Sequence, residues 1–244
     1  MEVGACSHIG MVRDANEDAY YLSDGDLNLF IIADGMGGHN AGEVASQIAI
    51  DTIREYISKK IGQSESISDE NINKFLKEAI ICANHAIFSK SLEEIEYQGM
   101  GTTLTVVLIL SKIFIGHVGD SRAYLLRNDH IIQITQDHSL VAELLRNGSI
   151  TENEARTHPQ RNIITRALGT EENITVDLYI LDPKRSEIIV LCTDGLSNLV
   201  NADEIKDVIT SSHSLQNACE SLVSLANARG GYDNITVVAT KIEH

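Results

Sequence analysis

Two nearly continuous apolar segments, separated by a dipeptide, constrain the fold of this chain more than any other feature. Residues 104–110 and 113–118 are rich in β-branched side chains and flank Ser111-Lys112, a pattern that predicts a β-hairpin. A strand with one face in water alternates apolar and polar residues, whereas these segments are apolar on both faces. We therefore expect a sheet that is covered on both sides.

Two longer segments have the spacing of amphipathic helices. Within 41–60 and 71–90, apolar residues recur every three or four positions, so each helix is expected to pack by one face. Shorter helices are predicted at 139–147, 202–211 and 215–228, and further strands at 27–33, 123–127, 131–135, 174–179, 188–192 and 235–241. Antiparallel strands mixed with long helices indicate the α+β class, for example two packed sheets with helices outside.

The composition limits the partners and the domain organisation that can be expected for this protein. The 244 residues include 19 basic and 35 acidic side chains, and the net charge of −16 argues against binding to nucleic acid or to an anionic membrane. No segment approaches the roughly 20 apolar residues of a membrane-spanning helix, and the N-terminal residues lack the pattern of a secretory signal. With two prolines and no repeat or Gly/Ser linker, we expect one domain over 1–244 and take a monomer as the default.

The four cysteines, Cys6, Cys82, Cys192 and Cys219, lie far apart in the sequence. None forms the Cys-x-x-Cys pair of a zinc site or a dithiol centre, so we expect reduced thiols and a cytoplasmic setting. A cysteine-based phosphatase needs an arginine six positions after its cysteine. No cysteine of this chain has one, which excludes that class of enzyme.

Four aspartates stand at or beside the ends of predicted strands. Asp34 ends L-F-I-I-A-D, Asp120 ends I-G-H-V-G-D, Asp194 ends I-I-V-L-C-T-D, and Asp233 precedes N-I-T-V-V-A-T. A single Asp-Gly pair is common in ordinary turns, but four such strand ends indicate a shared site. Carboxylates brought together repel one another unless a cation is bound. Because Mg²⁺ and Mn²⁺ prefer oxygen ligands, the pattern predicts a metal site at a sheet edge.

The segment that follows Asp34 is the most specific in the chain. The glycines of G-M-G-G-H-N-A-G would let the backbone approach a ligand closely. It does not match the nucleotide-binding patterns, because the chain has no G-x-x-x-x-G-K-[ST] and Asn40 takes the third glycine position of G-x-G-x-x-G. His39 could be an ordinary residue at a helix start. Beside a metal-bound phosphate, it would be a proton donor to a departing alkoxide.

Near the N-terminus, Arg13 opens the segment R-D-A-N-E-D. It could simply pair with the acids that follow it. Its functional interpretation is a planar, bidentate clamp on phosphate oxygens, for which arginine is better suited than lysine. Glu17 and Asp18 in the same segment could hold waters of the cations.

Seven short motifs occur in one order between residues 13 and 238: R-x-x-N-E-D, A-D-G-M-G-G-H, G-M-G-T-T, H-V-G-D-S-R, T-x-D-H-S, C-T-D-G-L and D-N-I-T-V. This series resembles the PPM (type 2C) family of metal-dependent protein serine/threonine phosphatases, most of all its compact bacterial members. The resemblance covers essentially the whole chain. It implies a four-layer α-β-β-α fold, with a central sandwich of two antiparallel β-sheets flanked by α-helices and the metal centre at one end.

The resemblance implies a set of metal ligands. Asp34 is expected to bridge two Mn²⁺ or Mg²⁺ ions, and the Gly35 carbonyl to bind one of them. Asp194 and Asp233 would complete the protein ligands of the pair. Asp120 would help Asp194 to hold a third, weaker ion.

The resemblance also implies roles around the phosphate. Asp18 and Glu17 would act on the ions through water. Arg13 would bind the substrate phosphate, and His39 would protonate the leaving oxygen. Residues 138–161 resemble the family's flap beside the active site, a candidate element for substrate contact or gating.

The predicted activity is hydrolysis of phosphoserine and phosphothreonine in proteins, by direct attack of a water activated at a binuclear Mn/Mg centre. The enzyme would counteract serine/threonine protein kinases. Its expected partners are phosphorylated proteins, including such a kinase and its substrates. The alternative is a catalytically inactive scaffold that binds phosphoproteins on the same fold.

Overall fold

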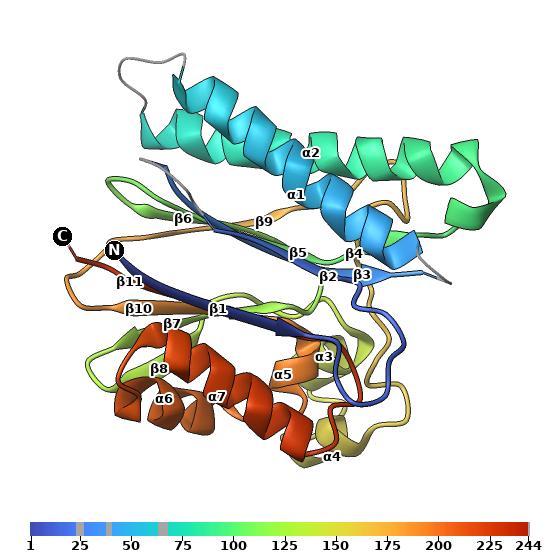
Figure 1. Cartoon of the computed structure of the whole chain (residues 1–244). Helices are drawn as coiled ribbons and strands as arrows, with labels where there is room; N and C mark the ends of the chain where they lie inside the picture. Colours follow the sequence, from blue (N-terminus) through green and yellow to red (C-terminus); the bar gives the residue numbers. More distant parts are fainter. Residues whose placement is uncertain (23–26, 38–40, 63–67, 244) are drawn as a thin grey trace.

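The computed structural model describes residues 1–22, 27–37, 41–62 and 68–243. Two antiparallel sheets pack face to face, and helices cover the outer face of each (Figure 1), which confirms the predicted sandwich. The five-stranded sheet has, in order, β1 (Glu2–His8), β11 (Ile235–Lys241), β10 (Ile188–Cys192), β7 (Arg122–Arg127) and β8 (His130–Gln133). The six-stranded sheet has β2 (Asp18–Leu22), β3 (Asn28–Met36), β5 (Leu104–Ile109), β6 (Ile113–Val118) and β9 (Asp177–Leu181), with β4 (Gly101–Thr102) beside β3.

The core has three layers, because central strands are buried on both faces. In β3, Leu29 and Ile31 belong to the layer beneath the helices, while Phe30 and Ile32 face the other sheet. The predicted hairpin is β5 and β6, and every residue of both strands is buried. Each such Ile, Leu or Phe stabilises the fold by about 1.5–3 kcal/mol relative to its exposed state, so the hairpin fixes the middle of the molecule.

The helices form the two outer layers. Helices α1 (Ala41–Gly62) and α2 (Asp69–Glu93) cover the six-stranded sheet, and α6 (Ala202–Ser211) and α7 (Leu215–Ala228) cover the five-stranded sheet (Figure 1). Shorter helices follow β8, β10 and α2: α3 (Leu140–Arg146), α4 (Glu152–Thr157), α5 (Asp194–Ser197) and the 3₁₀ turn η1 (Ile95–Tyr97). Helix α2 begins after Ser68, whose hydroxyl accepts a hydrogen bond from the Asn71 amide at 3.3 Å, so this cap starts the helix before the predicted 71.

Some elements differ from the sequence-based expectation. The strand predicted at 174–179 begins three residues later, as β9. The edge strands β1 and β2 were not predicted, because their residues are mostly half-buried and lack a long apolar run. Pairing with β11 and β3 creates these two strands. Helices α4 and α5 are too short for a periodic signal and were also missed.

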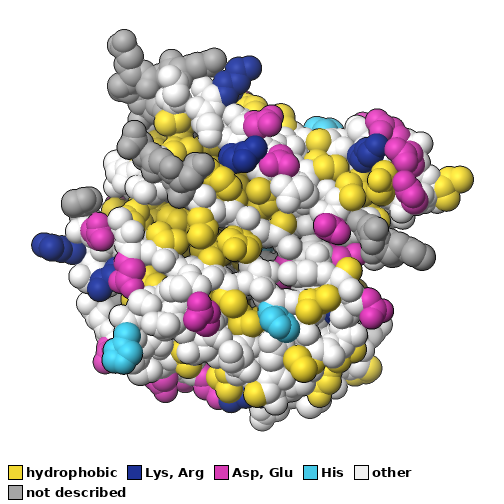
Figure 2. Space-filling view, viewed as in Figure 1, with side chains coloured by type: hydrophobic (Ala, Val, Ile, Leu, Met, Phe, Trp, Pro, Cys, Tyr) yellow, Lys and Arg dark blue, Asp and Glu magenta, His cyan; other side chains and the backbone are white. Residues whose placement is uncertain are grey.

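Acidic and hydrophobic side chains are both visible on the surface. No helix in the described ranges is long and apolar enough to cross a bilayer. On the face drawn in Figure 2, acidic side chains occur on the helical layer and on the lower half alike, and hydrophobic side chains form a band beneath the helices.

Candidate metal and phosphate site

Five carboxyls from distant parts of the sequence lie close enough for their charges to act on one another. They belong to strand ends that meet at one end of the sandwich. Asp34 lies in β3, and Asp18 is its register partner in β2. Asp120 follows β6, Asp194 follows β10, and Asp233 precedes β11. The six-stranded sheet thus supplies the first two, and the end of the five-stranded sheet supplies the last two.

The strand pairings explain why these positions coincide. In the antiparallel β10–β11 pair, Cys192 lies opposite Val237, so the end of β10 and the start of β11 share one edge. In the other sheet, Leu104 lies opposite Val118, and the Asp34 amide donates to the Thr103 hydroxyl at 3.1 Å. The strand predicted to end at Asp34 continues to Met36, so Asp34 is held within the ladder instead of in a free loop.

Burial and mutual repulsion raise the pKa values of the inner carboxyls. Burial is the largest cause for Asp34, whose pKa lies well above its usual range, and the carboxyls of Asp18, Asp194, Asp120 and Asp233 raise it further. Burial likewise raises the pKa to about 7 at Asp18, about 8 at Asp120 and about 6 at Asp194. Such a cluster is costly unless positive charge is present.

Several buried carboxylate oxygens lack hydrogen-bond partners, which indicates whether the cluster could hold a cation. Asp18 Oδ1, Asp120 Oδ1 and Glu17 Oε1 are buried and accept no hydrogen bond from the described residues. Buried polar atoms are normally satisfied, and orphaned carboxylate oxygens suit a hard divalent cation or its water shell. The donor set therefore fits Mg²⁺ or Mn²⁺.

The described side chains alone do not form a complete metal cage. No group of three or more His, Cys, Asp or Glu side chains in the described ranges has the arrangement needed to hold a metal ion by itself. Mg²⁺ in proteins commonly keeps several waters and uses only one or two carboxylates. The site thus needs oxygen atoms from backbone or water, the part expected of Gly35.

Arg13 lies at the rim of the cluster. Its guanidinium donates to Asp233 Oδ2 at 2.7 Å, and this hydrogen bond is the main cause that raises the pKa of Arg13. The side chain is 49% exposed, and its other N–H groups have no partner among the described residues. Arg13 therefore has donors left for an anion that approaches from solvent.

Other side chains, which the sequence interpretation did not assign, hold Asp18 and the segment before it in place. The hydroxyls of Thr193 and Thr236 donate to Asp18 Oδ2 at 3.0 and 2.7 Å, which joins the two sheets directly. The buried Asn234 donates to the Ile9 and Ala15 carbonyls, both at 2.9 Å. The signal was available, because C-T-D-G-L and D-N-I-T-V contain all three of these residues.

Of two further residues expected at the site, the structure describes only Gly35. Gly35 is packed so tightly that a Cβ would lie 2.2 Å from the Gly42 carbonyl oxygen. Its amide donates to the Glu17 carbonyl at 3.2 Å, so β2, β3 and α1 meet there. His39 lies outside the described residues.

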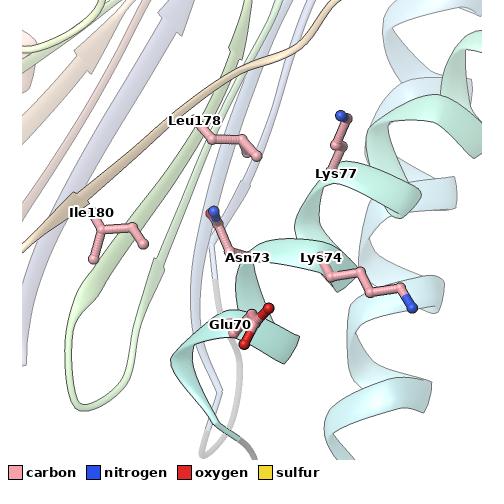
Figure 3. Close-up of a pocket in the computed structure, with 6 residues that line it drawn as sticks. All are labelled: Glu70, Asn73, Lys74, Lys77, Leu178 and Ile180. Carbon is pink, nitrogen blue, oxygen red and sulfur yellow. The ribbon is translucent and has the colours of Figure 1, made fainter.

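A cavity of about 500 Å³ lies elsewhere, between α2 and β9 (Figure 3). None of its lining residues belongs to the carboxylate cluster; they are Glu70, Asn73, Lys74, Lys77, Leu178 and Ile180. This cavity is therefore separate from the carboxylate cluster, which remains the candidate site.

The sequence model of the family described as Protein phosphatase 2C matches residues 7–229. The chain belongs to the protein phosphatase 2C family. A serine/threonine phosphatase stp of Listeria welshimeri is 38% identical over 232 residues, 94% of this chain and 91% of the relative. The crystal structure of the Mycobacterium tuberculosis serine/threonine phosphatase PstP/Ppp has a TM-score of 0.89 at 37% identity and covers 99% of this chain and 98% of its own.

A further solved structure bears on the metal. It is the catalytic domain of the serine/threonine protein phosphatase PstP in complex with two manganese ions, with a TM-score of 0.87 at 34% identity, covering 99% of this chain and 98% of its own. As a member of the protein phosphatase 2C family, the chain is a metal-dependent serine/threonine phosphoprotein phosphatase, and its substrates are phosphorylated proteins.

Proposed function

We propose that this phosphatase hydrolyses phosphoserine and phosphothreonine by direct attack of water, without a phosphoenzyme, at a site that takes two Mn²⁺ or Mg²⁺ ions. The observation that carries the proposal is the cluster of buried carboxyls with raised pKa values around Asp34. When bound, the ions would lower the pKa of water and offset the charge of the phosphoryl group.

Each residue of the chain has a distinct part in this proposal. Asp34, Asp194 and Asp233 would hold the ion pair together with the Gly35 carbonyl. Asp120, whose pKa is raised by Asp194 after burial, would share a third and weaker ion with it.

The remaining residues would serve the outer part of the site. Asp18 and Glu17, with their orphaned oxygens, would bind the water shell of the ions. Arg13 would orient the phosphate with the N–H groups that Asp233 leaves free, and fixed donors of this kind stabilise the charge of the transition state. His39 would give a proton to the departing serine or threonine oxygen.

We further propose that residues 1–244 act as one catalytic domain and as a monomer, in the cytoplasm, reversing the work of a serine/threonine kinase. The four cysteines are free, as a reducing setting requires. Burial raises the pKa values of Cys192 and Cys219 to about 12, which leaves both thiols unreactive at neutral pH. No observation on the described residues favours the inactive scaffold.

The testing experiment measures hydrolysis of phosphoserine, phosphothreonine and phosphotyrosine peptides with Mn²⁺, with EDTA and after thiol alkylation. We expect activity on the first two peptides, its loss in EDTA and little effect of alkylation. Asp194→Asn should lower kcat at least 100-fold, of the order expected when charge stabilisation is removed. The exposed Asp203→Asn on α6 is the matched control. Activity that survives EDTA but not alkylation would contradict the proposal.

The role of His39 can be tested by the choice of leaving group. His39→Ala should reduce kcat on a phosphoserine peptide by about 100-fold, the range of general acid catalysis, and much less on p-nitrophenyl phosphate, whose leaving group hardly needs a proton. His85→Ala, an exposed change on α2, is the control. Equal losses on both substrates would remove the proposed proton transfer.

A further inference from the structure

Three strongly exposed hydrophobic side chains lie close to Arg13. Met11 is 66% exposed, Val12 is 62% exposed and Tyr232 is 64% exposed. A single exposed apolar side chain needs no explanation, but a group of them beside a charged site marks a place where a ligand can bind. We call Met11, Val12 and Tyr232 the apolar rim.

The backbone builds the apolar rim from two segments. The Met11 amide donates to the Gly231 carbonyl at 2.7 Å, so the segments lie side by side. A Cβ at Gly231 would lie 2.8 Å from Met11 Cγ, and a Cβ at Gly230 would lie 2.5 Å from the Tyr232 ring. Both glycines have positive φ, 48° and 121°. The Tyr232 ring and the Met11 side chain therefore lie close to the glycine backbone of this turn.

The apolar rim is continuous with the phosphate clamp. Val12 is followed by Arg13 and Tyr232 by Asp233, and these two charged residues form the 2.7 Å ion pair. Consecutive Cα atoms are about 3.8 Å apart. A phosphorylated residue whose phosphate reaches Arg13 would thus have its neighbours in the substrate chain within reach of the rim.

We propose that the apolar rim is a subsite for a hydrophobic side chain next to the phosphorylated serine or threonine of the substrate. The inference rests on the proposed phosphate-binding role of Arg13. Aromatic and methionine side chains are the common anchors of such contacts. An acidic neighbour would fit poorly, because Asp14 and Glu17 lie in the same segment and the chain carries a net charge of −16.

The test compares two phosphoserine peptides that differ only in having Leu or Gly on both sides of the phosphoserine. We expect wild-type kcat/KM to favour the Leu peptide by about 3- to 10-fold, which is modest because the rim is open to solvent. The double variant Met11→Ser/Tyr232→Ser should bring this ratio close to one. The matched control is Leu92→Ser/Ile95→Ser, since these side chains are 72% and 92% exposed but lie at the end of α2 and in η1.

A wild-type ratio near one, or a ratio that survives Met11→Ser/Tyr232→Ser, would overturn the proposal. The conservative pair Met11→Leu/Tyr232→Phe should retain the preference, and its failure to do so would also count against an apolar subsite. Fluorescence polarisation with the same two peptides carrying a non-hydrolysable phosphonate gives the ratio of Kd values without turnover. If the wild type bound the Leu phosphonate more tightly yet hydrolysed neither peptide, the proposed function would fail while the subsite would stand.

Discussion

At the scale of single residues, the site depends on close approaches between backbone segments. A Cβ at Gly35 would meet the carbonyl oxygens of Gly42 at 2.2 Å and Glu17 at 2.6 Å. Both atoms belong to backbone, so neither can turn away as a flexible side chain would. The space at Gly35 thus fixes how β2, β3 and the start of α1 fit together.

Gly35→Ala should therefore destabilise the protein by about 2 kcal/mol or more, the range of overpacking. The free energy of unfolding, measured by urea denaturation in EDTA, checks this apart from metal binding. Gly62→Ala is the matched control, because nothing lies within 4 Å of a Cβ built at this last residue of α1. If the two variants unfolded at the same urea concentration, the packing explanation would be wrong.

At the scale of elements, one side chain ties the segment between β1 and β2 to the start of β11. Asn234 donates to the carbonyls of Ile9 and Ala15, and its Oδ1 accepts from the Glu17 amide at 2.8 Å. This segment carries Arg13. Its position over the carboxylates therefore depends on a residue next to Asp233.

Asn234→Ala should leave three backbone groups without their partner and lower the free energy of unfolding by about 2–3 kcal/mol. We also expect a raised KM for phosphopeptides, because the segment that carries Arg13 is released. Thermal unfolding and steady-state kinetics measure both effects. The exposed Asn71→Ala on α2 should change neither. An unchanged KM in Asn234→Ala would show that the Asn234 hydrogen bonds do not position Arg13.

The elements that could be predicted were those with a strong local pattern. Continuous apolar residues predicted β5, β6 and β10, and helical spacing predicted α1, α6 and α7. The motifs predicted which aspartates gather. The bonds from Thr193 and Thr236 to Asp18 could not be predicted, because they cross between sheets whose relative position no local pattern contains.

At the scale of the whole molecule, the carboxyl cluster predicts how stability depends on pH. An acid whose folded-state pKa is raised above 3.8 loses its stabilising contribution as pH rises through the folded value, about 7 for Asp18 and about 8 for Asp120. Burial lowers the pKa of His117 to about 4. This residue therefore makes stability rise with pH, but only below its ordinary pKa of 6.5.

Between pH 6.5 and about pH 8.5, we therefore expect the free energy of unfolding in EDTA to fall by about 3 kcal/mol. Excess Mn²⁺ should remove most of this fall, because a bound cation favours the charged carboxylates. Asp120→Asn should flatten the profile in EDTA, while Asp203→Asn should not. Identical pH profiles with and without Mn²⁺ would argue against cation binding at the cluster.

The division of the carboxylates between two sheets has a mechanical consequence. Side-chain packing holds the sheets together over most of their area, and at the carboxylate end Thr193 and Thr236 add hydroxyl contacts to Asp18. An ion held by residues of both sheets would resist movement of one sheet relative to the other. Metal binding should therefore slow the separation of the two sheets. Amide hydrogen exchange in β3 and β10 should slow together when Mn²⁺ is added.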